Sequence, residues 1–181
     1  MKKTLLFLSF VAITGTLFAQ KKTTTSAVVA FDATTDKDKL PKAENKTVIG
    51  VVDTKTGTVA FEATVKNFSF ANEKVQEHFN GENWLSSDAF PKFSYNGKID
   101  DLSKVDFTKD GTYNVSVSGD LTIKGITKPV TTTGTIVVKG GVLNATTNFS
   151  IKVADYGISG APIEGGKVSR EPKISVSAIL Q

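Results

Sequence analysis

The 181-residue sequence predicts an all-β fold: an eight-stranded antiparallel barrel with one short α-helical insertion between strands. About eight segments alternate apolar and polar residues with the period of two that marks a strand with one buried and one solvated face. The turns that can be recognised between these segments are short, as in antiparallel hairpins. Because every strand has an apolar face to cover, the sheet must form a sandwich or close into a barrel, and closure also removes exposed edges.

The first 19 residues are predicted to be a secretory signal peptide, which leaves residues 20–181 as one domain. Lys2 and Lys3 precede an apolar run over 5–18, and a small residue follows at the cleavage point. The run is shorter than the ~20 residues of a membrane-spanning helix, so a retained membrane anchor is the less favoured alternative. We therefore expect no transmembrane span, and a location in the periplasm or outside the cell.

The first part of the mature chain is predicted to hold three strands, at Ser26–Ala33, Thr47–Asp53 and Thr58–Lys66. A polar tether at 21–25 precedes them, and a charged connection at 36–45 follows the first strand. The second and third strands form a hairpin that places Phe61 opposite Gly50. A bulky side chain facing a glycine is expected inside a small, strongly curved barrel.

Residues 67–91 interrupt the β pattern and predict the short helix. Asn72 is a candidate N-cap, Val75 and Phe79 lie four apart on one face, and Asn80-Gly81 is a stop signal. This segment carries more aromatic surface than one short helix can bury alone. We expect it to pack onto the sheet or to cap an opening.

After a strand at 92–99 and a polar loop, residues 111–153 predict three long strands joined by two tight turns. The turn at 124–125 and the turn at 140–141 independently assign residues 130, 132, 134, 136 and 138 to one apolar face. Carried to the end of the third strand, this register puts Thr132 opposite Phe149. The same register puts Val130 opposite Ile151.

Small inward residues in this three-stranded segment are expected to leave room inside the barrel. They are Gly119, Thr132, Gly134 and Ala145. A long glycine-containing loop at 154–171 is typical of a lid or a mobile segment, and the last strand is predicted at 173–180.

The sequence offers little for catalysis, metals or nucleic acids. It contains no cysteine, and His78 is its only histidine, so we expect no metal site, no cofactor and no catalytic residue. His78 is interpreted as a surface or helix-packing residue. The net charge of +4 falls to about +2 without the signal peptide. A charge this small does not indicate binding of nucleic acid.

An apolar interior remains, and the sequence allows three interpretations of it. The first is a lumen that holds a long apolar chain, with Lys167 and Arg170 of the long loop as candidate contacts for an anionic head group. The second is a filled barrel that uses the aromatic segment 68–90 to dock a protein partner. The third, an enzyme acting on a lipid, lacks a candidate catalytic group. A second copy of the chain is a further candidate partner.

Strand parity and aromatic clustering select the residues that would bind the chain. Along the strands the candidates are Phe61, Val65, Phe93, Tyr95, Val115, Val117, Ile136, Phe149 and Ile151, and near a mouth they are Phe68, Phe70, Phe79 and Trp84.

Several motifs in the chain are shared with a known family. DGTY at 110–113 followed by GDLTIKGITKPV at 119–130 is the most specific. FSF at 68–70, EHFN at 77–80 and WLSSDAFPKF at 84–93 match the family's connection from helix to strand, and DYGI at 155–158 and KISV at 173–176 also fit. On these residues nearly all of the mature chain resembles the YceI-like family of polyisoprenoid-binding-like periplasmic proteins.

The resemblance implies an extended lipocalin-like barrel whose lumen holds a long-chain isoprenoid or another amphiphilic lipid. Our first hypothesis is therefore a non-enzymatic, exported lipid-binding barrel. Other members carry a histidine in an early strand, whereas the corresponding residues here, Phe31–Thr35, include none. We therefore expect that recognition of a polar head group, if it uses that histidine elsewhere, differs in this chain.

Overall fold

The computed structural model describes residues 20–181, and the predicted signal peptide lies outside the described residues. The chain is mostly strand. The strands are β1 (Lys21–Asp32), β2 (Lys42–Asp53), β3 (Thr58–Thr64), β4 (Ser69–Phe70), β5 (Lys92–Ile99), β6 (Gly111–Ile123), β7 (Ile126–Lys139), β8 (Val142–Ser150) and β9 (Lys173–Leu180).

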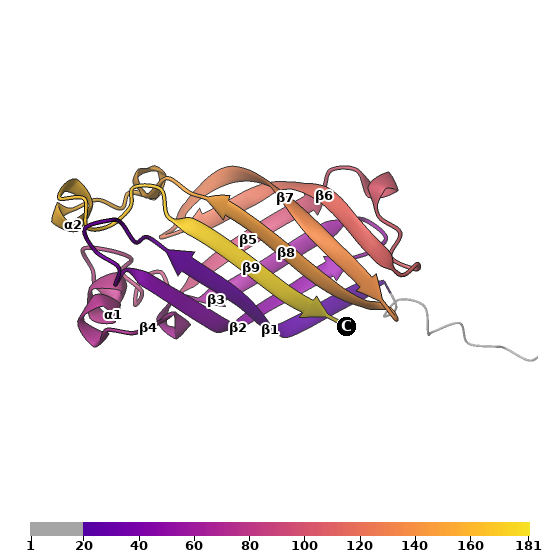
Figure 1. Ribbon diagram of the computed structural model, residues 1–181, viewed down its shortest axis with the longest axis horizontal. Helices are drawn as coiled ribbons and strands as arrows, with labels where there is room; N and C mark the ends of the chain where they lie inside the picture. Colours follow the sequence, from indigo (N-terminus) through magenta and orange to yellow (C-terminus); the bar gives the residue numbers. More distant parts are fainter. Residues whose placement is uncertain (1–19) are drawn as a thin grey trace, which may run out of the picture.

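Eight of these strands close into one barrel, which confirms the predicted fold (Figure 1). The order around the sheet is β1-β9-β8-β7-β6-β5-β3-β2, and pairing of β1 with β2 closes it. All pairings are antiparallel. The two-residue β4 adds to the start of β2. Closure leaves each long strand with one face toward the interior and one toward solvent.

The predicted registers hold wherever the strands are paired. Ile123 faces Ile126 and Val138 faces Leu143, as the two turns require. In the early hairpin Phe61 faces Gly50 as expected. The pairs predicted for the end of β8, Thr132 with Phe149 and Val130 with Ile151, do not form, because β7 and β8 pair only between residues 134–139 and 142–147. Beyond that point the two strands separate.

The polar segments on either side of the first predicted strand are also strand, contrary to expectation. Residues 21–25 begin β1 and lie against the end of β2, and 42–45 begin β2. The β1–β2 pairing contains two register shifts, next to Ala27. Such irregularities break the apolar–polar alternation of period two. Because these strand ends are also rich in polar residues, the alternation does not predict them as strand.

The short helical insertion is α1 (Glu73–Asn80), between β4 and β5. The Asn72 side chain accepts a hydrogen bond from the Val75 N–H at 3.2 Å, which confirms it as the N-cap. Gly81 ends the helix with φ of −63°, so this glycine is not required by a left-handed cap. The long loop contains a 3-10 turn, η3 (Val153–Tyr156). It also contains the second α-helix, α2 (Ala161–Glu164), which has four residues.

The two ends of the barrel differ. Helices α1 and α2 lie at the same end, here called the helical end (Figure 1). At the opposite end, here called the packed end, Val138, Leu143 and Leu180 are almost fully buried. The loop 100–110 lies over this end and contributes the buried Val105. Apolar side chains therefore fill the barrel at one end.

The backbones of β5 and β6 approach each other closely where Gly97 faces Gly119. A Cβ atom at Gly119 would overlap the backbone of Asn96 and Gly97, so no side chain fits there. Gly119 was expected to leave room in the interior. Its role is instead to let the two strands meet in a strongly curved wall.

We predict that Gly119→Ala lowers the free energy of unfolding by about 1–3 kcal/mol, because relief of the overlap requires backbone displacement. Urea unfolding followed by circular dichroism measures this. Gly81→Ala is the matched control: its Cβ would lie 3.3 Å from the nearest atom, the His78 carbonyl oxygen, at an ordinary φ. Equal stability of the Gly119→Ala variant and the wild type would contradict the proposed role of this glycine.

Candidate functional site: a hollow apolar lumen

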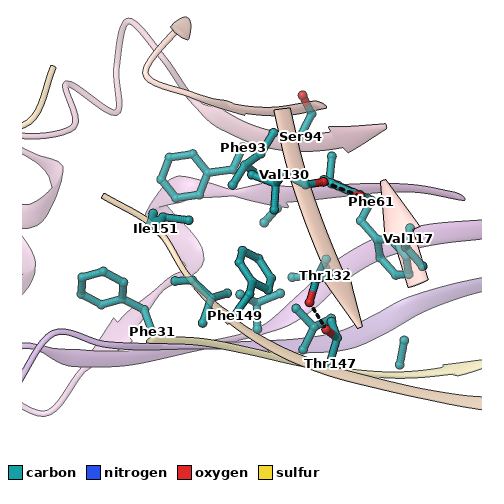
Figure 2. Close-up of a pocket in the computed structure, with 18 of the residues that line it drawn as sticks. Phe31, Phe61, Phe93, Ser94, Val117, Val130, Thr132, Thr147, Phe149 and Ile151 are labelled. Carbon is teal, nitrogen blue, oxygen red and sulfur yellow. Dashed lines mark hydrogen bonds between the residues drawn. The ribbon is translucent and has the colours of Figure 1, made fainter. Parts of the chain in front are cut away.

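The interior of the barrel holds a cavity of about 220 Å³, lined by side chains from all eight barrel strands. A single water molecule needs only about 10–15 Å³ by this kind of measure, so the barrel is not filled by its own side chains. Figure 2 shows Phe31, Phe93 and Phe149 pointing into this space from β1, β5 and β8. The interpretation of a filled barrel is therefore wrong.

The burial of the inward side chains also indicates a hollow interior. Phe61, Val117, Val130 and Phe149, which line the middle of the barrel, are only partly buried. Residues at the packed end, such as Leu180, are fully buried. In a filled core burial increases toward the centre. Here the central side chains are the more accessible ones, because the space in front of them is empty.

Aromatic rings lie against the wall and leave the middle of the lumen free. The Phe61 ring covers Gly50, where a Cβ atom would overlap it. The Tyr95 ring lies over Gly97 in the same way, within 2.8 Å of a Cβ placed there. On the opposite side the inward Ala145 contributes only a methyl group. The sequence thus supplies large rings where a glycine makes space for them, and small side chains elsewhere.

Aromatic residues close the helical end. Ring centroids of Phe68 lie 5.8 Å from those of Phe79 and Phe93, and Phe79 also lies 5.8 Å from Phe31 and 4.8 Å from Phe70. Phe68, Phe70 and Phe79 are buried, as expected of a segment that caps an opening. These rings are therefore not available for docking a protein partner.

Three polar side chains of the lining, Tyr95, Thr132 and Thr147, have hydrogen-bond partners within the protein. The Tyr95 hydroxyl donates to the Val130 carbonyl oxygen at 3.4 Å. The Thr132 and Thr147 hydroxyl oxygens lie 2.7 Å apart (Figure 2), and Thr147 also donates to the Thr133 carbonyl oxygen at 2.8 Å. Burial, with smaller effects of Asp100 and Asp120, raises the pKa of Tyr95. The phenol therefore stays neutral at physiological pH.

Eleven of the thirteen residues predicted to bind an apolar chain line the cavity. These eleven are Phe61, Phe68, Phe79, Trp84, Phe93, Tyr95, Val115, Val117, Ile136, Phe149 and Ile151. Val65 and Phe70 do not. Val65 lies in a 3-10 turn, η1 (Val65–Asn67), where the strand parity has ended, and Phe70 packs on α1 through Phe79. Both are buried outside the lumen.

The prediction missed other lining residues for two different reasons. Val29 and Phe31 on β1, and Ile174 and Val176 on β9, follow the strand alternation and could have been found by it. Ile158 reaches the cavity from the long loop, whose residues show no hydrophobic periodicity.

Glu62 is the only charged residue among those that line the cavity. Its carboxylate pairs with the Lys92 ammonium at 2.8 Å. His78 is exposed on α1, and Lys167 and Arg170 are exposed on the long loop without contributing to the lining. Within residues 20–181, no three metal-binding side chains come together, and no helix is long and apolar enough to span a membrane.

Fold and site together define a closed antiparallel β-barrel with a hollow, apolar lumen. The model of the YceI-like domain matches residues 9–180, so this chain belongs to the YceI-like family. The curated proteins gave no match to the sequence.

Solved structures share this fold at low sequence identity. BcnA of Burkholderia cenocepacia is 16% identical, with a TM-score of 0.70, over 86% of this chain and 96% of its own. A polyisoprenoid binding domain from Saccharophagus degradans, implicated in plant cell wall breakdown, is 12% identical, with a TM-score of 0.75, over 90% of this chain and 98% of its own. The YCEI protein of Campylobacter jejuni is 18% identical, with a TM-score of 0.55, over 74% of this chain and 80% of its own.

The raised pKa of Tyr95 predicts a loss of stability at alkaline pH. Because the folded state favours the neutral phenol, the contribution of Tyr95 is complete below the ordinary tyrosine pKa of about 10 and is lost as pH rises through the higher folded-state pKa. We expect Tyr95→Phe to flatten this alkaline decline in urea-unfolding midpoints. Tyr113→Phe, a tyrosine outside the cavity lining, is the control. Identical alkaline slopes for the wild type and Tyr95→Phe would contradict the prediction.

Proposed function

We propose that this protein is an exported, non-enzymatic lipid-binding protein that holds a long apolar chain, an isoprenoid or a similar amphiphile, in the barrel lumen. The observation that carries the proposal is the cavity of about 220 Å³ with an almost wholly apolar lining. Family membership supports the same class, as does the likeness in fold to a domain described as polyisoprenoid binding.

The physical basis of binding would be burial of apolar surface. Removing such surface from water contributes about 25 cal/mol per Å², so a chain that buries ~300 Å² gains about 7–8 kcal/mol before the costs of association. The lumen gives little hydrogen-bonding specificity, because Tyr95, Thr132 and Thr147 already bond within the protein. Chain length and shape would therefore determine the preference more than functional groups along the chain.

A charged head group would stay outside the lumen, since an unpaired charge in an apolar interior costs several kcal/mol. The lining described here includes one ionisable carboxylate, Glu62, which is already paired with Lys92. Phe31–Thr35 supplies no histidine for a head group either. The apolar leader at the start of the chain supports action in the periplasm or outside the cell.

Trp84 makes binding directly measurable. It is the only tryptophan in the chain, and it lines the cavity. All-trans-retinol, a fluorescent isoprenoid alcohol, should therefore accept excitation energy from Trp84 when it is bound. We expect saturable energy transfer at one retinol per protein, measured by titration of the mature chain.

A pair of adjacent substitutions tests whether the lumen is the site. Ala145 points into the cavity, so Ala145→Phe should fill part of it and weaken retinol binding by roughly tenfold or more. Asn144 is its neighbour on the opposite face of β8, so Asn144→Phe should leave affinity unchanged. Equal affinities for these two variants would count against lumen binding.

Native mass spectrometry of the protein purified from its own host tests for a natural ligand. A bound lipid of defined mass is the expected result. Absence of any lipid, under conditions that keep a control lipid carrier loaded, would overturn the proposed function.

A further inference from the structure

The backbone pairing of β7 with β8 covers only part of these two strands. The ladder of β6 with β7 runs without interruption to Ile123–Ile126, and that of β8 with β9 runs to Ser150–Lys173. The ladder of β7 with β8 stops at Gly134–Thr147. Residues 126–133 therefore lack a partner strand on the β8 side, although the register would allow the ladder to continue.

Threonine side chains mark the point of division. Where the backbone ladder ends, the Thr147 hydroxyl bonds to the Thr133 carbonyl oxygen at 2.8 Å and lies 2.7 Å from the Thr132 hydroxyl. These side-chain hydrogen bonds join β7 and β8 one step beyond the last backbone pair. We call residues 126–133 and 148–152, which face each other beyond this point, the slot.

The slot leads directly into the lumen. Val130 and Thr132 on one side, and Phe149 and Ile151 on the other, all line the cavity, which is partly open to the outside. Figure 2 shows the Thr132–Thr147 hydrogen bond with Phe149 beside it in the same cavity. At the outer end of the slot, Ile126 is 37% exposed and lies next to Gly157 of the long loop.

The two ends of the barrel are less suitable as routes to the lumen. At the packed end, Val138, Leu143 and Leu180 separate the cavity from solvent. At the helical end, the contacts among Phe31, Phe68 and Phe79 would have to break. Opening the slot requires the loss of the threonine hydrogen bonds and movement of two strand ends and of the long loop next to Ile126.

We propose that a ligand chain enters and leaves the lumen sideways, through the slot between β7 and β8, with the Thr132–Thr147 contact as its inner limit. This inference rests on the proposed function, because it concerns the exchange of the ligand held in the lumen. The slot also lets the polar head of an amphiphile stay in solvent while its chain lies inside. The head then needs no charged partner in the lumen.

A covalent bridge across the slot tests this route. The chain contains no cysteine, so Thr131→Cys with Ser150→Cys gives two unique thiols, both on exposed outward positions. A short bifunctional thiol reagent joins them, and mass spectrometry verifies the bridge. The matched control is Val137→Cys with Asn144→Cys, a directly paired outward position in the intact part of the same ladder. Neither pair lines the cavity.

Stopped-flow energy transfer from Trp84 to retinol gives the rates of association and dissociation. A blocked route slows both rates and leaves their ratio unchanged, because it does not alter the bound state. We expect the bridge across the slot to slow both by roughly tenfold or more, with an unchanged Kd. The control bridge should alter neither rate.

Unchanged rates in the protein bridged across the slot would overturn the slot as the route. So would a change in dissociation alone, which would mean that the bridge acts on the bound ligand. A failure of wild-type protein to bind retinol or any host lipid would instead overturn the proposed function, so the two failures are distinguishable.

A second variant tests the threonine contact without any bridge. Thr147→Val keeps the side-chain shape and removes the hydroxyl that bonds to Thr133 and Thr132. We expect retinol to associate severalfold faster, because the inner limit of the slot opens more easily. Thr122→Val removes a threonine pair on the outer face, with Thr127, and is the control. Association no faster than in the wild type would overturn the role of the threonine contact.

Discussion

Closure of the sheet through the β1–β2 pairing is the constraint on which the rest of this structure depends. A closed barrel of eight strands has an interior just wide enough to be filled by side chains or to hold one small ligand. Modest differences in side-chain size therefore decide between a filled and a hollow barrel. In this chain the rings of Phe61 and Tyr95 lie over Gly50 and Gly97, against the wall, and the middle stays open.

The stability of such a barrel is distributed unevenly. The packed end supplies a conventional core through Val138, Leu143 and Leu180, and the aromatic cluster around Phe79 supplies another at the helical end. The lumen between them contributes less, because its side chains lack partners across the cavity. A ligand chain would provide those missing contacts, so binding and stability should be coupled.

The separation of β7 from β8 gives the barrel an asymmetry that its closed topology does not suggest. The β2–β3 ladder, with four residue pairs, and the β1–β9 ladder, with five, also cover only part of their strands, and the β1–β2 junction contains two register shifts. Only the β7–β8 junction exchanges backbone hydrogen bonds for a threonine contact within residues 20–181. A small protein can thus keep a closed barrel and still retain a line along which its wall can part.

Local signals in the sequence determined the strands, the turns and most of the inward face. The registers Ile123–Ile126 and Val138–Leu143 follow from turns of two residues, whose geometry depends only on neighbouring residues. For the same reason, eleven of thirteen candidate binding residues line the cavity. Their role in binding a lipid stays a prediction, as does export of the protein.

Only the tertiary structure decided where the ladders begin and end. Residues 21–25 are strand because β2 lies beside them, and Val65 leaves the inward face because β3 ends before it. Thr132 and Phe149 do not pair, although the turn register permits it. The interior is hollow because rings from β3 and β5 fold onto glycines rather than toward each other. These outcomes depend on contacts between residues distant in the chain, which the alternation within a single strand does not encode.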